Sequence, residues 1–217
     1  FNQSTGFLAG KITLGRTLGF TTGGSIIGKL VISSQISGGG GLSIIGGASA
    51  SSFYLACPTN SFSGDIIHGK GYLYINNEVR RNQNSPLGNS ARPIRLSNNT
   101  ANTPVLAVNA DGVFERDIIV SNASSSVTIL TQTATNLVFT GSLSNNNSVL
   151  TLQPVYSSNL FEWAGSISGT GSIYKWGFGT LVLSGTNTDW TGGMTLAGGQ
   201  AGVSGGGAVI LNSPNPL

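Results

Sequence analysis

Two carboxylates offer the most direct route to catalysis in this sequence. Glu115 and Asp117 lie two positions apart, so in a strand they would share one face while Arg116 occupies the other. Hydrolysis of a glycosidic bond needs two facing carboxyl groups, and this pair could hold a sugar. A solvated strand edge is the far commoner explanation, and the calcium-binding pattern Gly-Gly-x-Gly-x-Asp is missing. We therefore expect a protein that is not an enzyme and has no metal or cofactor.

The other residues with reactive side chains also favour structural roles. His68 is the only histidine, and Asp65 precedes it by three residues, but no nucleophile stands in a recognisable setting beside this pair. We expect His68 to lie on the surface of the turn GDIIHGKG. The single cysteine, Cys57, excludes an internal disulfide, and we expect it to be a small buried apolar residue. The glycine runs 38–41 and 205–207 predict turns, because neither is followed by a helix or by Gly-Lys-Ser/Thr.

The aromatic residues near the end of the chain are the candidates for binding. Tyr174, Trp176 and Phe178 alternate along the sequence and would point to the side opposite Ile173. If the alternation continues through residues 177–179, they form an outward stripe that could stack on glycan rings or contact another protein. Alternatively, the intervening glycines bend the chain and the aromatic rings fold onto a neighbouring turn or onto the corner at Trp190.

The elements that must position these side chains are short strands. Helical periodicity is nearly absent, whereas runs of about five apolar and β-branched residues recur between Gly, Asn, Ser and Pro. The predicted strands lie at 30–36, 72–75, 116–120, 126–130, 136–141, 148–152 and 179–185. Short strands at this spacing are typical of a sandwich, a barrel or a solenoid, and internal repeats distinguish these folds.

Composition excludes several classes of function. Only 8% of residues are charged, while 39% are hydrophobic and 33 are glycine, so a narrow core can form beneath a surface of hydroxyls and amides. No apolar run approaches the ~18 residues of a membrane helix. The net charge of +3 does not indicate nucleic-acid binding, because four of the arginines fall in one stretch without interleaved aromatic residues. We expect these four to form an exposed basic loop: Arg80, Arg81, Arg92 and Arg95.

The chain also repeats, with a period of about 130 residues. ISGGGGL at 36–42 matches ISGTGSI at 167–173, NSFSGDI at 60–66 matches NTDWTGGM at 187–194, and NSPL at 84–87 matches NSPNPL at 212–217. The matches keep the same order and nearly the same offset. They divide a single solenoid domain, residues 1–217, into a partial repeat module at 1–87 and a full module at 88–217.

Residues 167–199 resemble the autotransporter-associated β-strand repeat. That family has a Gly-x-Gly pair, a Lys, a second Gly-x-Gly, Thr-Leu-x-Leu, and an Asn followed by an aromatic residue and Thr-Gly-Gly. The matching positions are Gly169, Gly171, Lys175, Gly177, Gly179, Thr180, Leu181, Leu183, Asn187, Trp190, Thr191, Gly192 and Gly193. The resemblance implies a right-handed parallel β-helix in a secreted or surface-displayed bacterial protein. Trp176 and Phe178 depart from the family, which has small polar residues there, and no β-barrel translocator is present.

Together these features predict a β-solenoid of roughly nine or ten rungs in which Ile173, Leu181 and Leu183 point inward. A single rung buries too little apolar surface to fold alone, so each depends on its neighbours. The leading hypothesis is a non-catalytic extracellular protein of the bacterial surface. It would stack end to end in a fibre, on copies of itself or on adjacent solenoid modules, or form part of a long passenger. The alternatives are a glycan-binding adhesin module that uses the aromatic stripe and, third, a polysaccharide-degrading β-helix enzyme.

Overall fold

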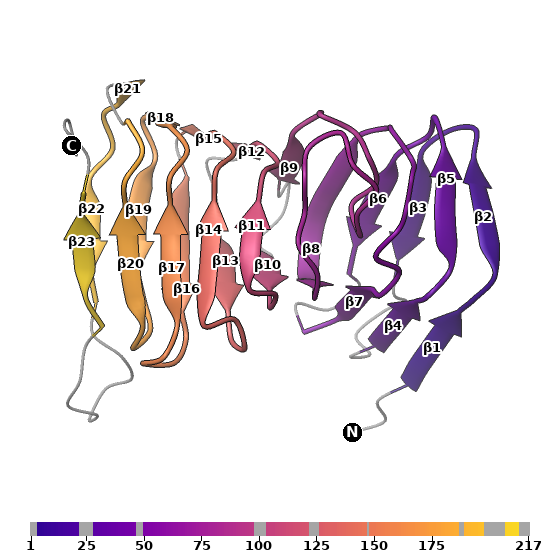
Figure 1. The fold of residues 1–217 in the computed structure, drawn as a ribbon, viewed down its shortest axis with the longest axis horizontal. Coiled ribbons are helices and arrows are strands. Elements are labelled where there is room, and N and C mark those ends of the chain that lie inside the picture. The colour runs from indigo at the N-terminus through magenta and orange to yellow at the C-terminus, as the bar shows by residue number, and fades with distance from the viewer. Residues whose placement is uncertain are drawn as a thin grey trace.

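The protein is a parallel β-solenoid in which successive turns of the chain stack along one axis (Figure 1). This computed structural model describes residues 4–21, 28–46, 50–97, 103–121, 126–146, 148–186, 189–197 and 207–212. Within these ranges every strand pair is parallel and no helix occurs, as the sequence predicts. No helix in this part of the chain is long and apolar enough to cross a membrane.

Each regular turn contributes one strand to each of three faces. The first face contains β1 (Ser4–Leu8), β4 (Gly28–Ile32), β7 (Ser52–Leu55), the second half of β8 (Ile66–Ile75), β10 (Pro104–Val108), β13 (Val127–Thr131), β16 (Val149–Pro154), β19 (Ser172–Lys175) and β22 (Met194–Leu196). The second face contains β2 (Lys11–Leu14) and β5 (Gln35–Gly38), then β11 (Gly112–Phe114), β14 (Asn136–Phe139), β17 (Leu160–Trp163), β20 (Thr180–Leu183) and β23 (Val209–Leu211). The third face contains β3 (Leu18–Thr21), β6 (Leu42–Ile45), the first half of β8, β9 (Ile94–Ser97), β12 (Ile118–Ser121), β15 (Leu143–Asn146), β18 (Ile167–Gly169) and β21 (Asp189–Trp190).

The regular strand pattern covers about seven turns, slightly fewer than the nine or ten predicted. Partners in adjacent regular turns lie close to 24 residues apart, as Ile94 and Ile118 do. The pattern is interrupted where residues 56–65 and 76–93 pass the second face without a strand, apart from one bridge between Val79 and Phe114. The second of these segments enlarges its turn, so the described turns are not all of one size.

The core is a narrow column of inward side chains. Leucine, isoleucine and valine alternate with outward residues, and Ile173, Leu181 and Leu183 are buried as their alternation predicts. On the second face three aromatic rings lie directly above one another in register: Phe114, Phe139 and Trp163. Their centroids are 4.7 Å apart at each step. This internal ladder gives three successive turns contact area on one another, so each of the three gains stability from its neighbours.

The corners bring backbone against backbone. Gly141, Gly165 and Gly185 occupy the same corner in successive turns, and a Cβ on either of the last two would overlap the carbonyl oxygen of the glycine below. At another corner Asp111 bridges two turns, because its Oδ1 accepts hydrogen bonds from the backbone N–H groups of Thr135 and Asn136. These bonds, that from Asn136 above all, lower the pKa of Asp111.

The repeated sequences form similar corners at different places in the solenoid. ISGGGGL leads from β5 on the second face to β6 on the third, whereas ISGTGSI leads from β18 on the third face to β19 on the first. The φ angles of the corresponding glycines are nearly equal, at 101° for Gly38 and 102° for Gly169. The first glycine of this repeat therefore adopts the same backbone conformation at corners between different faces. The division into modules at 1–87 and 88–217 stays a prediction.

Candidate functional site

The outer surface of the first face concentrates the polar aromatic residues of the chain. Two rows of outward side chains run along it, because parallel strands align residues at equal register. The first row is Lys29, Ser52, Tyr72, Val105, Thr128, Thr151, Tyr174 and Thr195. The second row is Val31, Tyr54, Tyr74, Ala107, Leu130 and Gln153. Trp176 extends the second row, since its amide donates to the carbonyl of Leu152. We call this surface the aromatic face.

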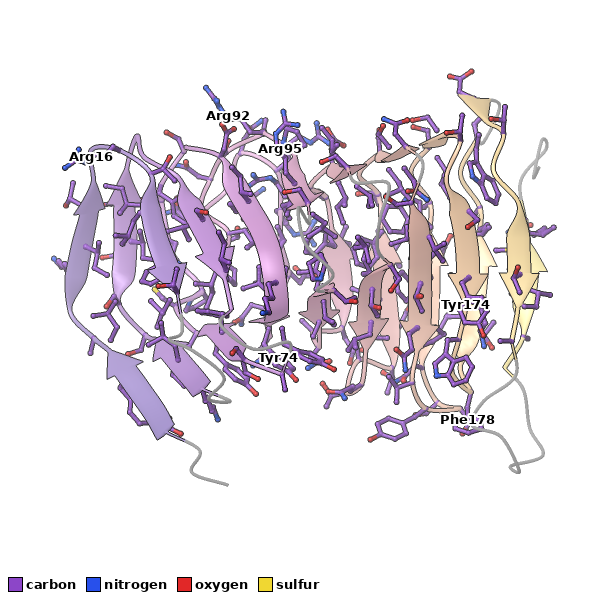
Figure 2. The ribbon with its side chains drawn as sticks, turned by 180° about the vertical axis from the view of Figure 1, so that it is seen from behind. Arg16, Tyr74, Arg92, Arg95, Tyr174 and Phe178 are labelled. Carbon is purple, nitrogen blue, oxygen red and sulfur yellow. The ribbon has the colours of Figure 1, made fainter. Side chains whose placement is uncertain are left out.

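Two aromatic pairs lie on the aromatic face. Tyr72 and Tyr74 in β8 have near-parallel rings with centroids 5.8 Å apart. Tyr174 in β19 and Trp176 just after it have nearly the same arrangement, with centroids 5.9 Å apart. Both pairs occupy the same two rows, and Figure 2 shows Tyr74 and Tyr174 well separated along the axis.

The first pair continues toward the N-terminal turns. Tyr54 in β7 stacks on Tyr74 with a centroid distance of 4.4 Å and an interplanar angle of 5°. The Lys29 ammonium lies 4.6 Å from the centre of the Tyr54 ring, a favourable cation–π distance. Burial raises the pKa of Tyr74 to about 12, so its hydroxyl stays protonated at neutral pH.

A small apolar cluster lies between the two aromatic pairs. Val105, Ala107 and Leu130 face outward yet are buried, and they form a cluster separate from the main core. Tyr72, Tyr74 and Val155 pack against it. The tyrosine rings therefore cover neighbouring strands as well as contacting one another.

Not every predicted binding residue lies on this surface. Tyr174, Trp176 and Phe178 are half-buried and alternate with buried residues, as the outward stripe requires, but Phe178 lies at the corner beyond β19. Trp190 does not join them. Its indole is buried on the third face, where Nε1 donates to the carbonyl of Gly171 at 2.8 Å.

The motif residues hold turns together. A Cβ on Gly171, Gly177, Gly179 or Gly192 would lie closer to atoms of the preceding turn than real Cβ atoms do, and the same is true of Gly169. Lys175 points inward and is 1% exposed, and its Nζ donates to the carbonyl of Gly177 at 2.5 Å. Burial lowers the pKa of this lysine. Asn187 lies outside the described residues.

The carboxylate pair is engaged by arginines. Arg80 contacts Glu115 at 3.3 Å, and Arg81 contacts Asp117 at 2.7 Å. The backbone N–H of Arg81 also donates to Glu115. Each carboxylate is therefore paired with an arginine of the segment 76–93. Glycosidic hydrolysis needs one carboxyl group as an acid and the other as a base or nucleophile beside a sugar, and this pairing does not favour those roles.

Arg116, between these two acids, is fully buried. Its guanidinium donates to the backbone carbonyls of Arg92 and Leu87. Burial, together with the nearby charge of Arg81, lowers the pKa of Arg116 to about 10, so it remains a cation at neutral pH. The four arginines expected in one exposed loop therefore differ: Arg80, Arg81 and Arg92 form ion pairs, and Arg95 is an exposed residue of strand β9 rather than of a loop. Arg92 is 62% exposed although it contacts Asp65 at 3.2 Å. Arg92 and Arg95 lie at the opposite edge of Figure 2 from Tyr74.

Two expectations for reactive residues were wrong. His68 is not on a surface turn but completely buried, with Nε2 at 2.9 Å from the carbonyl oxygen of Gly71 and 3.2 Å from that of Val105. The continuous strand β8 places it inside, because β8 crosses from the third face to the first without leaving the core. Cys57 is half-buried rather than buried. Among the residues that the structure describes, no group of three or more His, Cys, Asp or Glu side chains could hold a metal ion.

Sequence reasoning missed the first aromatic pair. Alternating tyrosines in YLYI at 72–75 predict one outward pair, but the sequence does not place that pair in the same rows as Tyr174 and Trp176. That alignment depends on the enlarged turn that contains residues 76–93, across which Tyr72 pairs with Val105. Comparison with protein-family models, curated proteins and solved structures finds no match to this chain.

Proposed function

We propose that this chain is a non-catalytic structural solenoid of the bacterial surface, which stacks end to end on copies of itself or on adjacent solenoid modules. Its end turns support this proposal. Among the described strands, none pairs with the outer edges of β1, β2 and β3 at one end, or of β21, β22 and β23 at the other. Such edges carry backbone N–H and C=O groups that can pair with another chain.

The apolar columns support stacking in the same register. At one end Met194, Leu196, Val209 and Leu211 continue inward columns, and Leu196 and Leu211 are 63% and 44% exposed. At the other end β2 offers Ile12 and Leu14 at the same two-residue spacing as Val209 and Leu211. A hollow of about 320 Å³, lined by residues 12–18, lies beside them. A solenoid turn placed there would continue both the sheet and the core.

Electron microscopy and sedimentation of the purified chain test this proposal. We expect concentration-dependent linear particles, and Leu196→Lys with Leu211→Lys should yield monomers, because stacking would bury both charges. Thr195→Lys with Ile210→Lys is the matched control, since these outward residues lie on the same two strands. Discrete monomers of the parent chain at high concentration, or linear particles that survive the leucine substitutions, would contradict end-to-end stacking.

A second candidate function, glycan binding by a surface adhesin, is favoured by the aromatic face. Four of the five tyrosines lie on it, and the fifth, Tyr156, lies two residues after the end of β16. Tyrosine and tryptophan combine a large contact area with hydrogen-bonding groups and are enriched at binding surfaces. Loss of glycan-array binding in Trp176→Ala, with an unchanged circular dichroism spectrum, is the expected result. Persistent binding would exclude Trp176 from the site.

A further inference from the structure

The two aromatic pairs are repeated along one direction of the molecule. Tyr72 and Tyr174 belong to one row, and Tyr74 and Trp176 to the other. Four strand-to-strand steps separate β8 from β19, through β10, β13 and β16. At about 4.8 Å per step the pairs stand roughly 19 Å apart. A ligand that contacts both must therefore be elongated and lie parallel to the solenoid axis.

The surface between the pairs is uncharged. Its outward residues are Val105, Ala107, Thr128, Leu130, Thr151 and Gln153. Val105, Ala107 and Leu130 are buried beneath their neighbours, so the accessible groups between the pairs are the half-buried Thr128, Thr151 and Gln153. The threonine hydroxyls and the glutamine amide can donate and accept hydrogen bonds. A ligand lying here would find a ring pair at each end and neutral polar groups along its length.

Charge limits the class of ligand. The described first-face strands contain no Asp or Glu, and Lys29 is the one charged residue in the two outward rows; Lys70 lies outside the rows, at the corner of β8 before Tyr72. Lys29 already contacts Tyr54 beyond the first pair. An acidic polymer would find no row of cations, and a basic one no carboxylates. A neutral chain rich in hydroxyl groups, with apolar C–H faces that stack on aromatic rings, fits both the rings and the polar groups between them.

We propose that the aromatic face binds one neutral oligosaccharide chain, which runs parallel to the solenoid axis and bridges the Tyr72–Tyr74 pair and the Tyr174–Trp176 pair. This inference rests on the glycan-binding candidate and adds a second contact site, an orientation and a minimum ligand length. Because the two pairs are fixed on one rigid sheet, a chain held by one pair meets the other at a high effective concentration.

Isothermal titration of the full chain with cellohexaose, chitohexaose and maltohexaose, and with the matching disaccharides, tests the proposal. At least one neutral hexasaccharide should bind about tenfold or more tightly than its disaccharide, whereas hexagalacturonate, the acidic control, should not bind. Tyr74→Ala and Trp176→Ala should each reduce hexasaccharide affinity to the disaccharide level. Tyr156→Ala, which removes an exposed ring outside the two rows, should leave the affinity unchanged.

One further variant separates bridging from simple adhesion and also covers the case in which Tyr74→Ala misfolds. Thr128→Arg places a long side chain midway between the two pairs, two strand steps from Tyr72 and two from Tyr174, so it leaves both ring pairs intact. It should abolish the hexasaccharide advantage while disaccharide binding persists. A disaccharide that binds as tightly as the hexasaccharide would overturn bridging but leave glycan binding intact. If no neutral probe binds, both bridging and glycan binding are overturned. The same is true if substitutions on the aromatic face affect only self-association of the chain.

Discussion

Acidification should destabilise the protein through its single histidine. His68 is fully buried, and burial lowers its pKa from 6.5 to about 4, although hydrogen bonds to backbone carbonyls oppose this shift. Because Nε2 faces two carbonyl oxygens, it must carry the proton of the neutral ring. Nδ1 has no hydrogen-bond partner. A second proton would create an uncompensated charge in the core.

The sign follows from which state binds the proton. Between pH 6.5 and 4 the unfolded chain binds a proton at His68 and the folded chain does not, so the free energy of unfolding falls as pH falls. A shift of about 2.5 units corresponds to about 3 kcal/mol in full, of which about 2 kcal/mol is lost between pH 7 and pH 5. Above pH 7 this contribution is constant.

Urea unfolding at several pH values and NMR of the one imidazole ring test this prediction together. The parent should lose about 2 kcal/mol between pH 7 and pH 5, and the folded-state imidazole should titrate near pH 4. His68→Gln keeps an amide donor near the Nε2 position and should remove this loss, since glutamine does not titrate. An equal loss in that variant, or a folded-state titration near pH 6.5, would refute the reasoning.

The remaining predictions concern packing and can be checked by the same unfolding measurement. Gly165→Ala should lower the free energy of unfolding by about 2 kcal/mol or more, because its Cβ would overlap the backbone of the preceding turn. Gly193→Ala is the control: nothing lies within 4 Å of its Cβ position, and its effect should be less than about 0.5 kcal/mol. Equal effects of the two substitutions would contradict the corner argument. Trp163→Ala should cost about 3–5 kcal/mol because it breaks the internal ring ladder, and a loss below 1 kcal/mol would mean that the ladder contributes little. Lys175→Met should be at least as stable as the parent at pH 7, because methionine fills the same space without a buried charge. Lys175→Ala should lose about 3 kcal/mol of unfolding free energy, because it leaves a cavity. A Met variant less stable than the parent would show that the ammonium group contributes net stability.

Much of the fold is predictable because short-range rules decide it. Alternating apolar residues such as Leu181 and Leu183 set the inward side of a strand, and glycines such as Gly169 mark corners at which a Cβ does not fit. These rules need only a few neighbouring residues. They predict parallel coils without locating any one strand on a particular face.

The features that the sequence does not predict depend on the lengths of individual turns. The glycines around His68 predict a turn, but β8 continues through Gly69 and Gly71, so the histidine enters the core. The segment 76–93 leaves the strand pattern and brings Arg81 to Asp117, a contact across 36 residues that has no local signal. The same enlarged turn sets the register that puts Tyr74 and Trp176 in one row. The register between strands far apart in the sequence therefore decides both the arginine–carboxylate contacts and the aromatic face. The alternation of residues along a single strand does not determine that register.

The low charge of the chain has a common explanation in this architecture. Each outward row repeats at the strand spacing of about 4.8 Å, at which like charges in successive turns would repel one another along the whole sheet. Hydroxyls, amides and aromatic rings can stack at that distance without repulsion, as Tyr54 and Tyr74 do at 4.4 Å. Most of the ion pairs gather at the irregular segment 76–93, where a loop rather than a strand supplies the cations. A solenoid of this kind therefore presents neutral polar and aromatic rows along its sides, which suit the elongated neutral ligand that we propose for the aromatic face.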